Sequence, residues 1–342
     1  MEKLTEPLSR EKVLRLISQS ASYGNLGAFI GAGFSKAVMN SDFDCIALSW
    51  GELLKKVADS LDIDYENIEK EGVGYPEIAS KLCELYSDSE SKSITYEESL
   101  RKIKEEIARL TCWYPDKNQS SKFSGHLRKL CFSWIITTNY DLVIESLLTG
   151  ASIPLGPNDS LIAPSGIVPV FHLHGVRTNP DEIIIAQEDY VGLFRPTEYR
   201  QIKLALMIKE STMLILGYGL GDVNVLTALD WSKNVFSGTP ENYPNGVIQV
   251  VKKDTPQEAP YRDRNSIIVI ETSSLEEFFE EYTKVRNESL EEERILKKSL
   301  SELASKLDNP DESMVEKFID DTEFRTYVLT KLSSFSNDLI SG

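Results

Sequence analysis

Cysteine is scarce in this sequence and never occurs as a close pair. The chain has 342 residues and four cysteines, Cys45, Cys83, Cys112 and Cys131. Because they stand singly, with no CxxC spacing, a dense disulfide framework is excluded. This usage of cysteine fits a reducing cytoplasm.

Long apolar runs are absent as well. No run approaches the ~18 residues that a membrane helix needs. Residues 1–16 carry charges throughout and have no apolar core of the kind found in a secretory signal. We therefore expect neither a membrane span nor a secretory signal, and we predict a cytoplasmic protein.

Basic residues are in deficit. The chain has 37 Lys and Arg against 54 Asp and Glu, so its formal charge is −17. An acidic surface repels phosphate backbones, which argues against direct nucleic-acid binding by the protein as a whole. A local basic groove stays open as an alternative.

Histidine is rarer still, with three residues in the chain. His172 and His174 alternate in an apolar run, so strand geometry would place them on the same side. They could be satisfied core residues or a pair of metal ligands. A three-histidine zinc site would also need His126, and no cysteine lies near them in sequence. We therefore expect no metal.

Short apolar runs that alternate with amphipathic segments are the main pattern present. Continuous apolar strands between helices predict an α/β fold, a Rossmann-like parallel sheet with helices on both faces. The expected strands are 26–30, 132–137, 167–173, 183–185, 213–216, 247–251 and 267–270. The expected helices are 1–23, 50–61, 78–86, 96–110, 141–148, 197–210 and 222–232, with a loop over 149–166.

Two helical additions extend the predicted sheet domain, which spans residues 1–270. A helical insertion occupies about 41–130, and an acidic helical C-terminal extension occupies 271–342. In the extension, one apolar stripe lies at 275–282 and a stripe of leucines lies at 296–307. Such stripes fit either a cap on the sheet or a surface for an oligomer or a partner.

Four polar or glycine-rich turns follow four of the expected strands. Each turn has an ordinary alternative, because glycine, threonine, asparagine and aspartate are common in strand–helix turns and helix caps. Open α/β sheets, however, bind ligands at the carboxyl ends of their strands. The four turns are GAGFS at 31–35, TTNYD at 137–141, FHLHG at 171–175 and LGYGLGD at 216–222.

In this order, the four motifs resemble the sirtuin family, specifically its bacterial sirtuin-like branch, over about residues 24–235. The resemblance implies NAD+ as the substrate. It also implies that Asn139 and His174 are catalytic and that Asp141 belongs to the nicotinamide pocket. The remaining positions that it assigns to NAD+ binding are Gly31, Ala32, Gly33, Phe34, Ser35 and Gly217.

Within this resemblance, single positions carry narrower expectations. Phe34 would cover the nicotinamide pocket, and the backbone N–H groups of 31–33 would hold the phosphates. Gly217 would border the adenosine end. Independently of the resemblance, the residues of the fourth motif suggest that Asp222 binds a hydroxyl of a ligand or caps the next helix.

Two departures from the sirtuin deacylases stand out. Thr138 occupies the position of a glutamine in that family, and the paired-CxxC zinc ribbon is missing. The helical insertion fills the space between the first two motifs instead. The branch with these features includes NAD+-consuming effectors of bacterial antiphage defence.

The expected activity is therefore that of an NAD+ glycohydrolase (NADase), which releases nicotinamide and ADP-ribose. The alternatives are an NAD-dependent protein deacylase and a non-catalytic nucleotide-sensing subunit. A dehydrogenase is disfavoured because Lys36 stands where the dinucleotide fingerprint has its third glycine. We expect control by homo-oligomerisation or by a separately encoded partner, such as a HerA-type DNA translocase.

Overall fold

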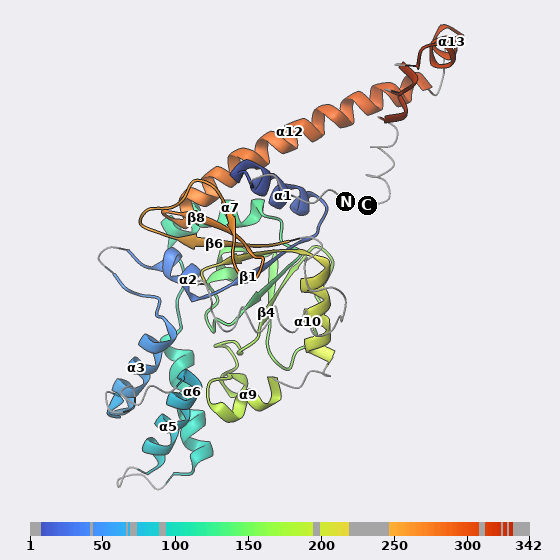
Figure 1. Ribbon diagram of the computed structural model, residues 1–342. Helices are drawn as coiled ribbons and strands as arrows, with labels where there is room; N and C mark the ends of the chain where they lie inside the picture. Colours follow the sequence, from blue (N-terminus) through green and yellow to red (C-terminus); the bar gives the residue numbers. More distant parts are fainter. Residues whose placement is uncertain are drawn as a thin grey trace.

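A single eight-stranded sheet forms the centre of the computed structural model of the protein, and helices pack on both of its faces (Figure 1). The structure describes residues 8–41, 44–65, 68, 74–88, 94–193, 199–218, 246–307, 312–322, 324–326 and 328–330. The strands are β1 (Leu26–Ile30), β2 (Trp134–Thr137), β3 (Ser152–Leu155), β4 (Val168–His172), β5 (Thr212–Leu216), β6 (Val247–Lys252), β7 (Tyr261–Arg262) and β8 (Ile268–Thr272).

The strand order is β3-β4-β2-β1-β5-β6-β8-β7. All neighbouring strands are parallel except β7, which runs antiparallel to β8 at the edge. The chain builds outward in one direction from β1 through β2 and β4, and in the other direction through β5. Such a reversal opens a crevice at the carboxyl ends of the central strands, where doubly wound sheets bind ligands.

Both faces of the sheet are buried, which explains the continuous apolar runs of its strands. In β1, Ala28 and Ile30 belong to one hydrophobic cluster, while Phe29 belongs to the cluster on the opposite face. Strands covered on both sides need apolar residues at every position rather than at alternate ones. The predicted Rossmann-like α/β fold with a parallel sheet is confirmed.

Helices from both ends of the chain cover the first face. The buried residues of this face come from α1, α2, α8 and α12 as well as from the sheet. Leu204 and Ile208 of α10 pack on the other face. These helices are α1 (Arg10–Ser22), α2 (Ala32–Met39), α8 (Val143–Leu147), α10 (Tyr199–Glu210) and α12 (Leu275–Leu307).

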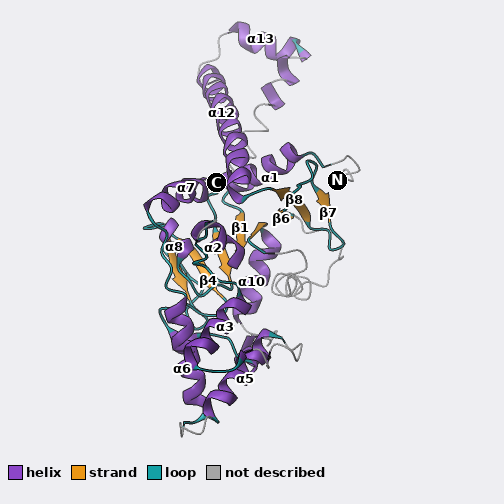
Figure 2. Cartoon of the chain, turned by 90° about the vertical axis from the view of Figure 1, so that its left-hand side faces the viewer, coloured by secondary structure: helices purple, strands orange, loops and turns teal. Residues whose placement is uncertain are grey.

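The helical insertion lies between β1 and β2, and most of it extends beyond the carboxyl ends of the strands (Figure 2). Its helices begin at sequence-encoded caps, such as the capping box formed by Thr95 and Glu98. A nearly buried ion pair of 2.8 Å joins Lys104 in α6 to Asp189 in α9. The helices of the insertion are α3 (Trp50–Leu61), α5 (Tyr75–Ser87), α6 (Tyr96–Leu110) and α7 (Lys117–Lys129). The helix α9 (Gln187–Leu193) follows β4 and lies outside the insertion in sequence.

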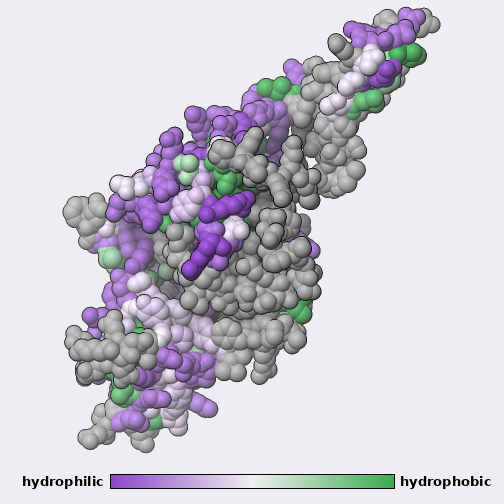
Figure 3. Space-filling view, viewed as in Figure 1, coloured by the Kyte–Doolittle hydropathy of each residue, from purple (hydrophilic) through white to green (hydrophobic). Residues whose placement is uncertain are grey.

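The C-terminal extension begins as a cap and continues as an arm. Phe278, Phe279 and Tyr282 of α12 are fully buried, so the first apolar stripe covers the sheet domain. Beyond this anchor, α12 projects from the body toward α13 (Glu312–Asp320) (Figure 1). Hydrophilic residues dominate the visible surface of α12 near the body (Figure 3). The side chains of the leucine stripe at 296–307 lie outside the described part of the chain.

Several local expectations were wrong or incomplete. The predicted loop over 149–166 contains the edge strand β3, which pairs with β4 despite Pro154, as an edge position allows. Residues 183–185 form no strand, although Ile183 and Ile185 are fully buried. They follow a short 3₁₀ helix (Pro180–Glu182). The predicted helix 222–232 lies outside the described residues. None of the described helices is long and apolar enough to cross a membrane.

Candidate functional site

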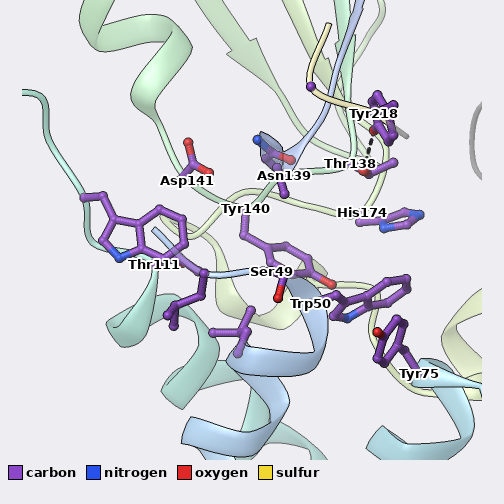
Figure 4. Close-up of a pocket in the computed structure, with 15 residues that line it drawn as sticks. Ser49, Trp50, Tyr75, Thr111, Thr138, Asn139, Tyr140, Asp141, His174 and Tyr218 are labelled. Atoms are coloured by element: carbon purple, nitrogen blue, oxygen red, sulfur yellow. Dashed lines mark hydrogen bonds between the residues drawn. The ribbon is translucent and has the colours of Figure 1, made fainter. Parts of the chain in front are cut away.

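A pocket of about 260 Å³ opens at the carboxyl ends of the central strands. The turns after β1, β2, β4 and β5 form one side of it, and the helical insertion forms the other (Figure 4). Four sequence-distant turns thus meet at one place, as the parallel sheet requires. Five of the predicted site residues line this pocket: Ala32, Asn139, Asp141, His174 and Gly217.

Asn139, Ser35 and Asp141 form a buried hydrogen-bonded chain. The Asn139 amide donates from Nδ2 to Ser35 Oγ at 3.0 Å, and the Ser35 hydroxyl donates to the Asp141 carboxylate at 3.0 Å. Because a carboxylate only accepts, these donors also fix which end of the Asn139 amide carries the nitrogen. Figure 4 shows the Asn139 amide oxygen turned toward Thr138 and away from Asp141.

Asp141 is an unusual carboxylate because it is 4% exposed and anchors this chain. Burial raises the pKa of Asp141 from its ordinary value of 3.8 to about 6. Hydrogen bonds from the Val143 N–H and the Ser35 hydroxyl favour the charged form and offset only part of that rise. Asp141 therefore changes its protonation state close to neutral pH.

His174 lies among aromatic rings at the opposite end of the pocket. Its ring centroid is 5.8 Å from that of Trp50 and 5.3 Å from that of Tyr190, and the residue is 5% exposed. Burial lowers the pKa of His174 from 6.5 to about 4. At neutral pH the ring is therefore uncharged and able to accept a proton.

The glycines of the first and fourth motifs bring two turns into direct contact. The Gly33 N–H donates to the Gly217 carbonyl at 3.0 Å, and the Gly31 N–H donates to the Leu216 carbonyl at 2.9 Å. A Cβ atom on Gly33 would lie 2.7 Å from the Gly217 oxygen. The N–H groups expected to hold phosphates are thus bonded to the protein backbone at two of the three positions, 31 and 33, and phosphate binding by this turn stays a prediction.

Phe34 is not among the residues that line the pocket. Phe34 is fully buried in the core, with its ring 6.4 Å from that of Phe123, so it does not cover the pocket as expected. Its place in the helix α2 turns its side chain toward α7 rather than toward the strand ends. Asp222 lies outside the described residues.

His172 and His174 occupy different environments, contrary to the expected shared side of a strand. The strand β4 ends at His172, and His174 follows in a turn, so the strand alternation does not extend to it. Both ring nitrogens of His172 have protein partners. Within the described residues no group of three or more potential metal ligands is found.

The insertion contributes aromatic residues that the motifs did not indicate. Trp50 at the start of α3 and Tyr75 at the start of α5 line the pocket beside His174 (Figure 4). The centroids of their rings are 5.3 Å apart. Tyr218 bonds through its hydroxyl to that of Thr138 at 2.6 Å. Trp50 was visible in the sequence only as the first residue of an amphipathic helix.

A comparison with known families matches one part of this site to a known domain. Residues 133–283 match the family model described as a SIR2-like domain. The matched stretch runs from β2 into α12 and carries Asn139, Asp141, His174 and Gly217, while the 31–35 turn precedes it and packs against it. No curated protein matches the chain significantly. SIR2-like domains use NAD+, which supports an NAD-related function of the sirtuin type. The chain thus carries a SIR2-like domain, and the resemblance of its motifs to the sirtuin family is confirmed.

Proposed function

We propose that this protein hydrolyses the nicotinamide–ribose bond of NAD+ and releases nicotinamide and ADP-ribose. The observation that carries the proposal is the convergence of Asn139 and His174 on one pocket with Ala32 and Gly217. An amide that is held by Ser35 and a neutral imidazole thus face the same small volume. They come from the turns after β2 and β4, where a bound NAD+ would place its reacting ribose.

The reaction needs a leaving group, a nucleophile and a proton acceptor. Nicotinamide leaves with the electrons of the C–N bond, and an oxocarbenium-like carbon remains on the ribose. Water adds its oxygen to that carbon and gives up one proton. In this scheme the Asn139 amide oxygen accepts from a ribose hydroxyl or from the water, and His174 accepts the proton.

The walls of the pocket favour water over a larger acceptor. An acyl-lysine would have to approach the ribose beside His174, where Trp50 and Tyr75 of the insertion line the pocket. The zinc ribbon that flanks the acyl-lysine cleft of sirtuin deacylases has no counterpart in the sequence, since its four cysteines stand singly. Hydrolysis is therefore better supported than deacylation.

The test is to incubate the purified protein with NAD+ and to separate the products by chromatography. We expect free nicotinamide and ADP-ribose in equal amounts, and no release from an Asn139→Ala variant. O-acyl-ADP-ribose formed with an acetylated peptide would support the deacylase instead. Cyclic ADP-ribose would indicate attack by the adenine in place of water.

The activity is expected to fall as the pH drops through about 6, because Asp141 takes up a proton there. A protonated Asp141 is a weaker acceptor for the Ser35 hydroxyl and can itself donate, so it no longer fixes the direction of the chain to Asn139. His174 stays neutral in this range, since its pKa is about 4. The measurement is kcat/KM for nicotinamide release between pH 5 and 8, which reports groups of the free enzyme.

An Asp141→Asn variant is the control for that pH profile. It should lose the acid limb, and an unchanged limb in this variant would contradict the assignment to Asp141. Stability changes in the opposite sense, because the folded protein binds the Asp141 proton more tightly than the unfolded chain. From this group alone, stability is highest below pH 3.8 and falls until the pH passes about 6.

We further propose that the enzyme depletes NAD+ in bacterial antiphage defence and is controlled by self-assembly or by a partner such as a HerA-type DNA translocase. Uncontrolled loss of NAD+ would harm the cell that makes the enzyme. Val315 and Ile319 lie one turn apart on α13 and are 44% and 62% exposed, a surface that such a contact would cover. Sedimentation is expected to show species above 38.5 kDa. A monomer at every concentration would contradict self-assembly.

A further inference from the structure

His172 is the most completely enclosed titratable side chain next to the pocket. Its side chain is fully buried, and each ring nitrogen has one partner. Nδ1 lies 2.8 Å from the backbone carbonyl oxygen of Asn139, and Nε2 lies 2.7 Å from Oε1 of Glu145 in α8. A carbonyl oxygen and a carboxylate oxygen are both acceptors only. With Glu145 ionised, both ring nitrogens carry protons, and the geometry is that of an imidazolium paired with a carboxylate.

The charges around His172 agree with that protonation state. Burial alone would lower the pKa of His172, because it disfavours the charged ring. The Glu145 carboxylate opposes this effect most strongly, the Asn139 carbonyl adds to it, and Asp141 contributes from the turn after β2. Together they hold the pKa of His172 above its ordinary value. Glu145 faces the ring from α8 and Asp141 from the turn, so both acidic groups lie on neighbouring elements.

The hydrogen bond from His172 to the Asn139 carbonyl matters because it restrains a third polar group of Asn139. The Asn139 N–H donates to Thr137 Oγ1 at 3.1 Å, which fixes the peptide group on that side of the residue. His172 fixes the following peptide group from β4. Ser35 holds the side-chain nitrogen. With these three groups bonded, both the backbone and the side-chain nitrogen of Asn139 are held in place.

We infer that His172 is a positioning residue that holds the Asn139 carbonyl through Nδ1–H and so aims the Asn139 amide into the pocket, with Glu145 orienting the His172 ring. This role presupposes the NAD+ hydrolysis proposed above and adds two residues to it that touch no substrate. It gives the two histidines of the third motif different roles. The neutral His174 faces the reacting ribose, and the charged His172 holds Asn139 in place.

Two substitutions divide the contacts of His172 between them. In His172→Asn, the amide nitrogen takes the place of Nδ1 and can still donate to the Asn139 carbonyl, but Glu145 loses its partner. In His172→Gln, the amide nitrogen reaches the place of Nε2 and keeps Glu145 paired, but the Asn139 carbonyl is released. Stability and turnover should therefore rank the two variants in opposite orders.

We expect His172→Gln to lower kcat on the order of 10- to 100-fold with little change in KM, since misplaced catalytic groups cost rates of this size. His172→Asn should keep kcat within about 5-fold of wild type, because it keeps the hydrogen bond to Asn139. Its melting temperature should be the lower of the two. Equal losses of kcat, or a loss of kcat that follows the melting temperature, would overturn the positioning role.

A second measurement does not depend on turnover. The chain has three histidines, so ¹⁵N-labelled histidine gives a simple NMR spectrum of the rings. His126→Gln assigns one ring and is the matched control, since His126 bonds Thr283 and is not among the residues that line the pocket. At pH 7 we expect both His172 nitrogens to be protonated, and Glu145→Gln to return the ring to its neutral form.

The two proposals fail on different results. A wild-type His172 ring whose Nδ1 carries no proton at pH 7 would overturn the positioning role, whatever the activity of the protein. A protein that binds NAD+ but releases no nicotinamide, with His172 doubly protonated, would overturn the hydrolase instead. The same samples serve both measurements, so neither outcome can be mistaken for the other.

Discussion

Replacing His174 with alanine is expected to lower the rate of nicotinamide release by about 10²–10⁴-fold, the usual contribution of a general base. The physical reason is the state of the ring. Burial holds the pKa of His174 at about 4, so the ring is uncharged throughout the physiological range and has a nitrogen lone pair available as a base. No other histidine lines the pocket. The measurement is nicotinamide release under saturating NAD+, with melting curves for the same samples.

Loss of packing must be separated from loss of the base in this experiment. His174 contacts the rings of Trp50 and Tyr190, so alanine also removes aromatic contacts. His174→Phe keeps a ring of similar size in that place and has no basic nitrogen. We expect it to be as inactive as the alanine variant but closer to wild type in melting temperature. A phenylalanine variant with the wild-type rate would contradict the proposed role of His174.

The sheet was predictable because strands that are buried on both faces appear in the sequence as short continuous apolar runs. Leu26 to Ile30 is apolar at every position, and the strand β1 has those bounds. The predicted 183–185 strand failed for a related reason: apolar residues are also buried in irregular segments, and periodicity over three residues does not separate the two cases. The strand β3 was missed because Pro154 and its partly exposed neighbours resemble a loop.

The part of the candidate site that is set by the sheet topology was predictable, and the part that is set by how the helical insertion packs against the sheet was not. Asn139, His174 and Gly217 follow separate strands, and a parallel sheet brings the carboxyl ends of its strands together. Trp50 reaches the pocket because of how the helical insertion packs, and no spacing in the sequence records that packing. The Phe34 prediction failed in the same way, since the turn fixed its position along the chain but not the direction of its side chain.

The contact between the two glycine turns could not be derived from the sequence either. A GAG motif after a strand indicates room for a phosphate, and only the structure shows that the Gly217 carbonyl accepts from the Gly33 N–H. In the structure, the glycines allow two backbones to touch. Positive φ at Gly217, +73°, is part of that arrangement.

Gly217→Ala is therefore expected to destabilise the protein on the order of 3–5 kcal/mol, the size that marks a specific structural conflict rather than a typical substitution. An added Cβ would lie 2.2 Å from the Phe34 nitrogen and 2.9 Å from the Gly31 oxygen. Both are backbone atoms of the neighbouring turn, so no flexible side chain can move aside. The left-handed backbone adds about 1–2 kcal/mol for any residue with a Cβ.

Gly24→Ala is the matched control, because Gly24 also has a positive φ, +65°, but a Cβ there would meet nothing within 4 Å. Urea denaturation of the two variants should show the backbone cost alone for Gly24→Ala and a much larger loss for Gly217→Ala. The difference between them measures the contact of the two turns. If the variants are equally stable, the turns do not touch as described, and the Gly33 N–H is free to donate to a phosphate of NAD+. A large difference instead means that the Gly217 turn must move away from the 31–33 turn before Gly33 can donate to a phosphate.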